Sequence, residues 1–363
     1  RAGSKLSYRP YEGQSWYDNA SPIDYTLRYE TPLKSVSHQL NWGLQSRYMD
    51  ALGRHSIYAT YKIKNNDVVK VSLNTMYRKA NGPDNYLLNP KEWSSYSGGK
   101  TGNTQKNSFV EIEYNHPYAW KGQGQVALKL RSPLTYQYAF AEGEWKHQHS
   151  WKKLDFKYRL FGRYGIGDQI PTESALYLAG ANPENLMDDK FARSQGIIPQ
   201  AWMNYRDRNE GHFHEGGGLN LRSYAAYYAL EQGPNGVKYI NYKGKSGAAC
   251  NVEIDVDRLV KFQPKLTRNT LHLDVYVFGD AGIISRGAYN AANISTLVPV
   301  DSWSKLRADA GLGAALTIKR FGKFETIKPF TLRFDMPLFV NAPPAAAPEY
   351  LGPRWTFGIN RAF

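Results

Sequence analysis

The segment Lys153–Arg163 reads KLDFKYRLFGR and alternates apolar and charged residues with a period of two. Successive side chains of a β-strand point to opposite faces, so this segment is predicted to be a strand with one apolar face and one charged face. The two sets are Leu154, Phe156, Tyr158 and Leu160 against Asp155, Lys157 and Arg159. The fold class depends on which of these two faces meets the interior.

The same alternation recurs along the chain and predicts about thirteen strands, or fourteen with Lys5–Tyr11. Several runs reach roughly ten residues, which is longer than most soluble strands and about what a tilted strand needs to cross a bilayer. No segment of convincing length has the helical period. Besides Lys5–Tyr11 and Lys153–Arg163, the predicted strands are Asp24–Thr31, His38–Tyr48, Ser56–Lys64, Val68–Arg78, Ser108–Asn115, Gln125–Arg131, Leu134–Phe140, Asn251–Leu259, Leu271–Asp280, Leu306–Lys319, Lys328–Leu338 and Arg354–Phe363.

Composition excludes several classes of protein. The 363 residues are 42% hydrophobic and 21% charged, which excludes a disordered chain and a helical membrane protein. Tyr, Phe and Trp number 27, 15 and 9, whereas Cys250 is the single cysteine, so neither an internal disulfide nor a cysteine-rich metal site is possible. The formal charge of +14 fits a nucleic-acid surface, an acidic membrane surface or a basic channel lining.

Two features favour a membrane barrel over a soluble sandwich. Tyr and Trp gather near strand ends, as in the interfacial girdles of outer-membrane barrels. Mixed charges also occur in mid-strand, which suits a water-filled lumen, and a closed barrel is the only β-structure that satisfies its backbone in lipid. The Tyr residues recur at alternate positions of the predicted strands. An interfacial girdle explains this placement better than stacking on nucleic-acid bases does, so no nucleic-acid partner is expected. The mid-strand charges include Arg307 with Asp309 and Arg333 with Asp335.

The predicted fold is therefore all-β, a transmembrane antiparallel β-barrel of about 14–16 strands in the cell outer membrane. Residues 1–363 form this one domain, with a long inserted loop at about 181–248. Its expected surroundings are outer-membrane lipid and lipopolysaccharide.

The C-terminus carries a signal typical of outer-membrane barrels, which is a period-two run that ends on an aromatic residue. Arg361 interrupts the apolar face of this run and is predicted to snorkel to the membrane interface. The residues that make up the signal are Trp355, Phe357, Ile359 and Phe363.

Catalytic motifs are absent from the sequence. There is no His-Glu-x-x-His and no Gly-x-Ser-x-Gly, and Gly244-Lys245-Ser246 is not a phosphate loop because Tyr239 stands where its first glycine belongs. His212 and His214 lie on one side of an extended segment, as a metal-binding pair or as part of a solvated loop. His147 and His149 are expected to be solvated. We therefore predict no catalytic residue, no metal, no cofactor and no enzymatic activity.

The longest irregular stretch, from Leu178 to about Ala248, contains the segment GGGLNLRSY at Gly216–Tyr224. This segment resembles the sixth extracellular loop of the BamA family, which comprises outer-membrane assembly factors, two-partner secretion translocators and related barrels. In that family the loop folds into the lumen and carries a Gly-Gly … Val/Leu-Arg-Gly-Phe/Tyr motif. The matching residues here are Gly217, Gly218, Leu221, Arg222, Ser223 and Tyr224, with Ser223 in place of the motif glycine.

The strands on either side match the family's order, so that the resemblance covers roughly Lys153–Phe363. It implies that the loop arginine is held by acidic residues on the lumen side of the next two strands, which here are Glu253 and Asp280. The alternation of residues agrees with this position, because Val252 and Ile254 point to one face of the strand and Glu253 points to the other. The alternative is a solvated Arg222 without a fixed partner.

The resemblance implies that the barrel inserts or translocates polypeptides into or across the outer membrane, through a weakly paired seam between its first and last strands. Polypeptide substrates and accessory envelope proteins would be its partners. Two alternatives remain: a passive porin, and an anchor barrel whose peptidase or phosphoesterase domain lies outside this chain. The family barrel has sixteen strands and usually follows POTRA domains. Since none is visible and no leader precedes Arg1, we expect the chain to be a fragment of a larger protein.

Overall fold

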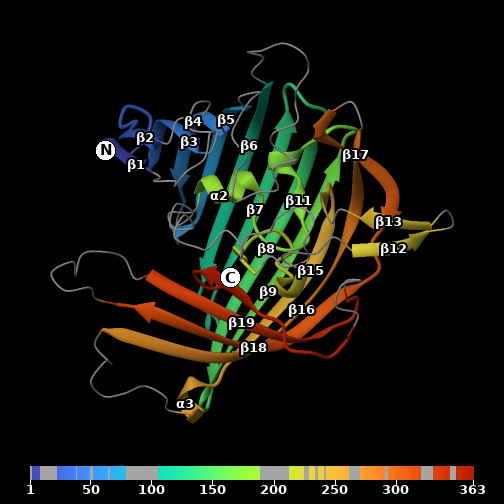
Figure 1. The fold of residues 1–363 in the computed structure, drawn as a ribbon. Coiled ribbons are helices and arrows are strands. Elements are labelled where there is room, and N and C mark those ends of the chain that lie inside the picture. The colour runs from blue at the N-terminus through green and yellow to red at the C-terminus, as the bar shows by residue number, and fades with distance from the viewer. Residues whose placement is uncertain are drawn as a thin grey trace.

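A computed structural model describes most of the chain and gives one dominant β-sheet (Figure 1). None of the helices in the described residues has the length and apolar character needed to span a membrane. The described residues are 2–8, 23–37, 39–49, 52–63, 66–78, 105–188, 212–224, 229–233, 236–240, 243–260, 270–290, 293–319, 330–343 and 349–363.

The main sheet has sixteen strands, and fourteen of them form a path in chain order. All neighbours on this path pair antiparallel, which confirms the predicted all-β class and antiparallel sheet. The path runs through β1 (Ala2–Tyr8), β2 (Ile23–Pro32), β3 (Leu40–Met49), β4 (Leu52–Lys62), β5 (Val68–Arg78), β6 (Gln105–Tyr118), β7 (Gln123–Pro133), β8 (Ala139–Trp151), β9 (Leu154–Ile166), β15 (Gly247–Asp255), β16 (Leu271–Asn290), β18 (Arg307–Ile318), β19 (Phe330–Val340) and β20 (Thr356–Ile359).

The sheet curves around an interior that holds part of the segment inserted between β9 and β15, including the helix at Pro183–Asp188 (Figure 1). Within the described residues β1 and β20 are the two ends of the strand order, and no ladder joins them. Two further strands extend the sheet, namely β10 (Ile170–Pro171) and β17 (Asn293–Trp303), which pair with each other, while β17 also pairs with β16.

The inserted segment contains more regular structure than its sequence indicates. No strand was predicted between Leu178 and Ala248, yet a short hairpin lies there. Residues 189–211, 225–228, 234–235 and 241–242 of the predicted loop lie outside the described residues. The remaining elements are η3 (Thr172–Ser174), β11 (Leu176–Tyr177), α2 (Pro183–Asp188), η6 (Arg222–Tyr224), the hairpin strands β12 (Ala229–Gly233) and β13 (Gly236–Ile240), β14 (Lys243–Gly244) and, after β15, α3 (Asp257–Val260).

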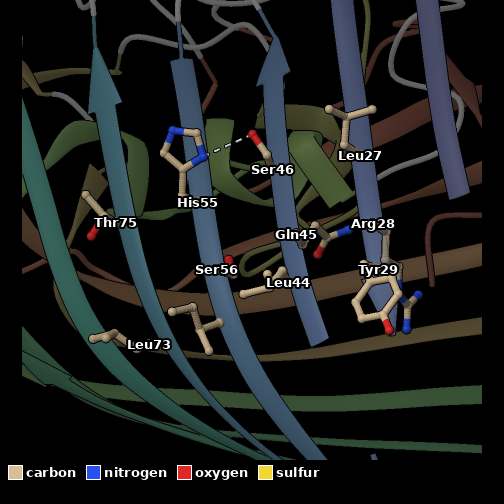
Figure 2. A pocket seen from close by; sticks show the side chains of 11 residues that line it. Leu27, Arg28, Tyr29, Leu44, Gln45, Ser46, His55, Ser56, Leu73 and Thr75 are labelled. Carbon is tan, nitrogen blue, oxygen red and sulfur yellow. Dashed lines mark hydrogen bonds between the residues drawn. The ribbon is translucent and has the colours of Figure 1, made fainter. Parts of the chain in front are cut away.

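The faces of the strands carry the polarity that the sequence assigns, with apolar side chains outward and charged side chains inward. Nine outward side chains from β2 to β19 are 42–56% exposed, whereas six charged inward residues are 0–6% exposed. Figure 2 shows part of the outward surface over β2–β5, where Leu27, Leu44 and Leu73 lie near a hydrogen-bonded Ser46–His55 pair (3.0 Å). The outward set is Leu27, Ile57, Leu73, Ile112, Leu130, Leu160, Val277, Leu312 and Phe334, and the inward set is Arg54, Glu111, Arg131, Arg159, Asp280 and Arg333.

Two strand predictions were wrong in extent, and one strand was missed. Residues 134–138 of the predicted strand Leu134–Phe140 form a turn, and β8 follows it. Most of β8 was not predicted, because alanine, glycine and histidine occupy five of its seven outward positions and leave little apolar contrast. The strand predicted at Leu271–Asp280 continues to Asn290 as β16. β17 was also missed, since Pro299 within its run argues against a strand.

The predicted terminal strand Arg354–Phe363 was wrong as well, because β20 covers only Thr356–Ile359. Asn360 follows with φ = 70°, a left-handed conformation that asparagine tolerates better than most residues, and the chain turns inward there. The carbonyl of Ala362 accepts a hydrogen bond from the Asn220 side chain of the inserted segment (3.1 Å).

Arg361 does not snorkel to an interface. Its guanidinium lies in the interior and contacts Glu253 (2.5 Å) and Asp255 (2.8 Å). The acidic inward face of β15 supplies the charge-assisted acceptors that an apolar face lacks, which explains the inward turn.

Candidate functional site

Arg222 of η6 is fully buried and contacts three carboxylates on the inward face of the sheet. It donates to both carboxylate oxygens of Asp280 on β16, from Nε at 2.9 Å and from Nη2 at 3.1 Å. Nη1 donates to Glu253 of β15 at 2.8 Å and lies 3.6 Å from Asp335 of β19. The structure thus brings Arg222 together with the two acidic residues that the sequence singled out, in a bidentate and charge-assisted geometry.

Further members of this anchor were missed by sequence reasoning. Asp309 of β18 accepts the main-chain N–H of Ser223 at 3.1 Å, and Asp335 accepts the hydroxyl of Tyr276 at 2.6 Å. Both aspartates alternate with apolar residues in predicted strands, and this alternation predicts that they face the interior. It did not indicate which interior charges lie within reach of Arg222. We call Arg222, Glu253, Asp280, Asp309 and Asp335 the Arg222 anchor.

The glycines of the loop motif are needed by the backbone that leads to Arg222. Gly218 has φ = 54°, and a Cβ built there would lie 2.5 Å from the carbonyl oxygen of Tyr177. Ser223, in contrast, is not among the described residues with positive φ, and its N–H is bound by Asp309. Serine therefore replaces the motif glycine without backbone strain.

Strand side chains bind the loop's main chain as well. Arg159 of β9 donates to the carbonyl of Gly218 (2.8 Å), and the Asn251 amide of β15 donates to the carbonyls of Leu219 and Asn220 (3.3 and 3.2 Å). Leu221 is fully buried and Tyr224 nearly so, in a cluster with apolar residues of β11, β16 and β19. The loop motif thus packs into the interior of the sheet.

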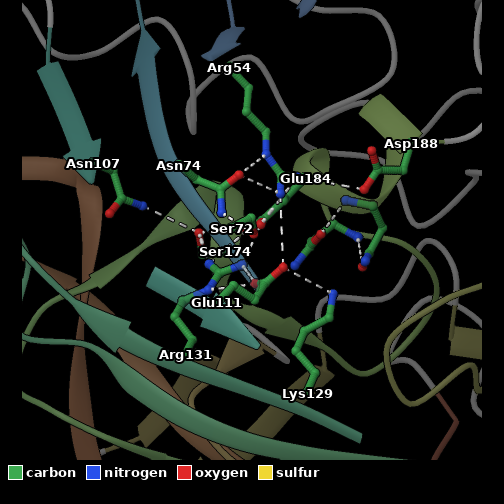
Figure 3. Close-up of polar contacts among 12 residues, drawn as sticks. Arg54, Ser72, Asn74, Asn107, Glu111, Lys129, Arg131, Ser174, Glu184 and Asp188 are labelled. Carbon is green, nitrogen blue, oxygen red and sulfur yellow. Dashed lines mark hydrogen bonds and ion pairs between the residues drawn. The ribbon is translucent and has the colours of Figure 1, made fainter. Parts of the chain in front are cut away.

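A second set of charges, four of them buried, holds α2 against the inward face of β3, β4 and β7 (Figure 3). Glu184 of α2 accepts from Arg131 of β7 through both carboxylate oxygens and lies 3.7 Å from Arg54 of β4. Asp188 pairs with Arg47 of β3 and lies 3.6 Å from Arg54. Glu111 of β6 also accepts from Arg131. We call these residues the α2 clasp, namely Arg47, Arg54, Glu111, Arg131, Glu184 and Asp188.

The α2 clasp was not predicted from the sequence. Arg54, Glu111 and Arg131 stand on the inward parity of their strands, but the six residues of α2 are too few to give a helical period. Burial disfavours the charged form of Glu184, yet the charges of Arg131 and Arg54 hold its pKa below the usual 4.5. Glu184 is therefore ionised at neutral pH.

The histidines considered as ligands have other partners. His212 stacks on Trp355, with ring centroids 3.5 Å apart, and His214 accepts a hydrogen bond at Nδ1 from Arg333 (2.6 Å). Burial holds the pKa of His214 well below its usual value, and Arg333 and Arg222 lower it further, so the neutral form accepts this bond. His147 and His149 stack with aromatic rings on the outward face and are half-buried rather than solvated.

One cluster in the described part of the chain has ligand atoms close enough to hold a metal ion. Asp257, His272 and Asp274 place one such atom each within 4.8 Å of one another. The guanidinium of Arg361 lies 3.7 Å from Asp274 and opposes a cation there.

The terminal-strand residues differ in their surroundings. Phe357 pairs in register with the outward-facing Phe334, whereas Ile359 is 1% exposed. Trp355 lies against His212, and the Phe363 ring lies 5.9 Å from the Arg222 guanidinium. The position of Phe363 follows from the turn at Asn360, which the sequence could not reveal.

No family model and no curated protein matches the sequence. The chain is similar to a solved structure of BamA from Haemophilus ducreyi lacking POTRA domains 1-3, with 10% sequence identity and a TM-score of 0.48. The match covers 93% of this chain and 62% of that chain, so this chain spans less than two thirds of its length. At this level of similarity the match defines neither family nor function.

Replacing Arg222 by Ala is expected to destabilise the docked loop by about 3–5 kcal/mol, because buried carboxylates lose their partner. The change would be measured as a lower unfolding temperature. Samples are incubated at increasing temperatures, and the loss of the folded band is followed on gels run without further heating. Arg28→Ala is the matched control, since Arg28 pairs with Glu30 at the protein surface and such pairs contribute about 0–1 kcal/mol. Equal effects of the two substitutions would contradict the role given to the anchor.

Glu184→Gln is expected to loosen α2 by about 1.5–3 kcal/mol at pH 7, because charge-assisted hydrogen bonds to Arg131 are lost. The folded pKa of Glu184 is lowered, so its stabilisation is complete above 4.5 and is lost as the pH falls through the folded value. Hydrogen exchange of the α2 amides should therefore differ between wild type and variant at pH 7 and converge at lower pH. Glu113→Gln, which breaks the more exposed Lys70–Glu113 pair, is the control. A difference independent of pH would contradict the assignment.

Proposed function

We propose that this chain is an outer-membrane β-barrel that inserts or translocates polypeptides through a seam between its first and last strands. The membrane part of the proposal rests on the polarity of the sheet. An outward surface of half-exposed Leu, Ile and Val around an interior of buried Arg, Glu and Asp is the reverse of a soluble protein. Lipid is the solvent that such a surface matches.

Exposed tryptophans at short turns support the same proposal. Trp120 (68% exposed) lies in the turn between β6 and β7, and Trp151 (57% exposed) is the last residue of β8. Lys121 and Lys152 place their ammonium groups over the rings of these neighbouring tryptophans, at 5.4 and 4.9 Å. Paired Trp and Lys residues at strand ends are typical of membrane–water interfaces.

One observation supports the seam, namely the weak pairing of the last strand. β20 pairs with β19 at four positions, whereas β8 and β9 pair at thirteen. Edge strands present main-chain groups that can template another strand, and a short one costs little to displace. Such an edge is suited to pairing with an incoming polypeptide segment.

The alternatives have less support. A passive porin needs a water path through its lumen, whereas the inserted loop places Leu219, Leu221 and Arg222 there with no exposure. An anchor barrel has no use for a weakly paired last strand. The proposed activity is non-covalent, with no catalytic residue or cofactor, and its partners are outer-membrane lipid, lipopolysaccharide, unfolded polypeptides and accessory envelope proteins.

Leu130→Arg is expected to destabilise the chain in phospholipid vesicles by about 2–4 kcal/mol, because it places a charge on the lipid-facing side of mid-strand β7. Leu134→Arg is the matched control, since Leu134 is as exposed (58% against 53%) but lies in the turn after β7. Urea titration in vesicles measures both. Equal, small effects would mean that the outward face does not meet lipid.

A disulfide between β1 and β20 is expected to stop the proposed activity. In a Cys250→Ala background, cysteine pairs would be scanned across Ala2–Tyr8 and Thr356–Ile359. The probe is a urea-unfolded eight-stranded outer-membrane barrel, whose folding into vesicles is followed by gel shift. The closed seam should reduce its folding rate to that of empty vesicles, and dithiothreitol should restore it.

The control disulfide joins β18 to β19 through Thr317→Cys and Thr331→Cys, whose hydroxyl oxygens lie 2.9 Å apart. It staples strands that are already paired and should leave the rate unchanged. Full activity with the β1–β20 disulfide closed would refute gating at the seam.

A further inference from the structure

The inserted segment contributes a piece of extended chain to the edge of β20. The main-chain N–H of Phe357 donates to the carbonyl of His212 (2.5 Å), and the N–H of His214 donates to the carbonyl of Phe357 (2.8 Å). These two bonds make a parallel bridge between Phe213 and Phe357. Residues 212–214 therefore lie beside β20 as a short additional strand.

The pairing lies on the edge of β20 that faces away from β19, which we call the seam edge. A strand residue directs its N–H and C=O to the same side, and this side alternates along the strand. Since Phe357 gives both groups to residues 212–214, its neighbours Thr356 and Gly358 face β19, in register with Asp335 and Arg333. The seam edge is the side on which the next strand of a closed sheet would pair.

Two side-chain contacts hold the segment in place. The His212 ring stacks on Trp355 and its Nδ1 lies 2.9 Å from the carbonyl oxygen of Trp355. Arg333 of β19 donates to both Nδ1 (2.6 Å) and the carbonyl oxygen (2.8 Å) of His214, which is 1% exposed. The seam edge thus offers an aromatic platform and, two residues further on, a guanidinium donor.

We propose that residues 212–214 are a resident strand that covers the seam edge of β20 and is displaced by an extended segment of the polypeptide substrate. This inference rests on the function proposed above and adds a substrate preference to it. The incoming segment pairs in parallel with β20, places an aromatic or imidazole ring on Trp355, and two residues later presents a hydrogen-bond acceptor to Arg333. Main-chain bonds give affinity and the two side-chain positions give selectivity.

The test uses a fluorescent peptide with the sequence of residues 209–216, NEGHFHEG, against the full chain in detergent. His214→Pro removes the donor N–H and the imidazole, whereas the matched variant His214→Ala removes the imidazole alone. We expect His214→Pro to bind the peptide at least tenfold more tightly than wild type, and His214→Ala to gain less. A scrambled peptide should bind none of the three tightly.

His212→Ala provides a second weakened edge in case His214→Pro does not fold. It keeps both main-chain bonds and the Arg333 contacts, and it loses the stack on Trp355 and the contact of Nδ1 with the Trp355 carbonyl oxygen. It should gain peptide affinity and speed hydrogen exchange of the Phe357 amide. Unchanged peptide binding in every variant that folds would overturn the resident strand. Loss of the barrel-insertion activity with peptide binding still enhanced would count against the proposed function and leave the resident strand standing.

Discussion

Burial of charge is the constraint on which this structure depends. The inward face of the sheet carries arginines and carboxylates with almost no exposure, and a buried charge is tolerated only with a partner and further hydrogen bonds. Neighbouring strands supply some of these partners, as with Arg131 and Glu111. The inserted segment supplies others, so its docking completes the compensation of charge inside the sheet.

The inserted segment is held at two places on different walls. The α2 clasp ties it to β3, β4 and β7, and the Arg222 anchor ties it to β15, β16, β18 and β19. The signs of the charges are reversed between the two, since the loop gives carboxylates to an arginine wall in the clasp and a guanidinium to a carboxylate wall in the anchor. A docking in the wrong orientation would therefore set like charges against each other, which favours a single position of the loop.

The sequence predicted features that follow from local alternation and missed those that depend on distant contacts. The facing of Glu253 and Asp280 follows from parity alone, and a short motif identified Arg222 as their partner. Most of β8 escaped detection because alanine, glycine and histidine take five of its seven outward positions. The α2 clasp joins residues from five separate elements, and the terminal run was interrupted by one left-handed asparagine, Asn360, that no periodicity reveals.

The end of the chain is connected to the Arg222 anchor through one carboxylate. Glu253 binds Arg222 with Oε1 and Arg361 with Oε2, at 2.8 and 2.5 Å. Moving either guanidinium leaves a buried carboxylate only half compensated, so the loop anchor and the residues after β20 depend on each other. Since residues 212–214 belong to the same inserted segment and pair with β20, the loop fixes the last strand from both its edge and its end. The short last strand is thus held mainly by the loop, and loosening the loop is the physical route to opening the seam.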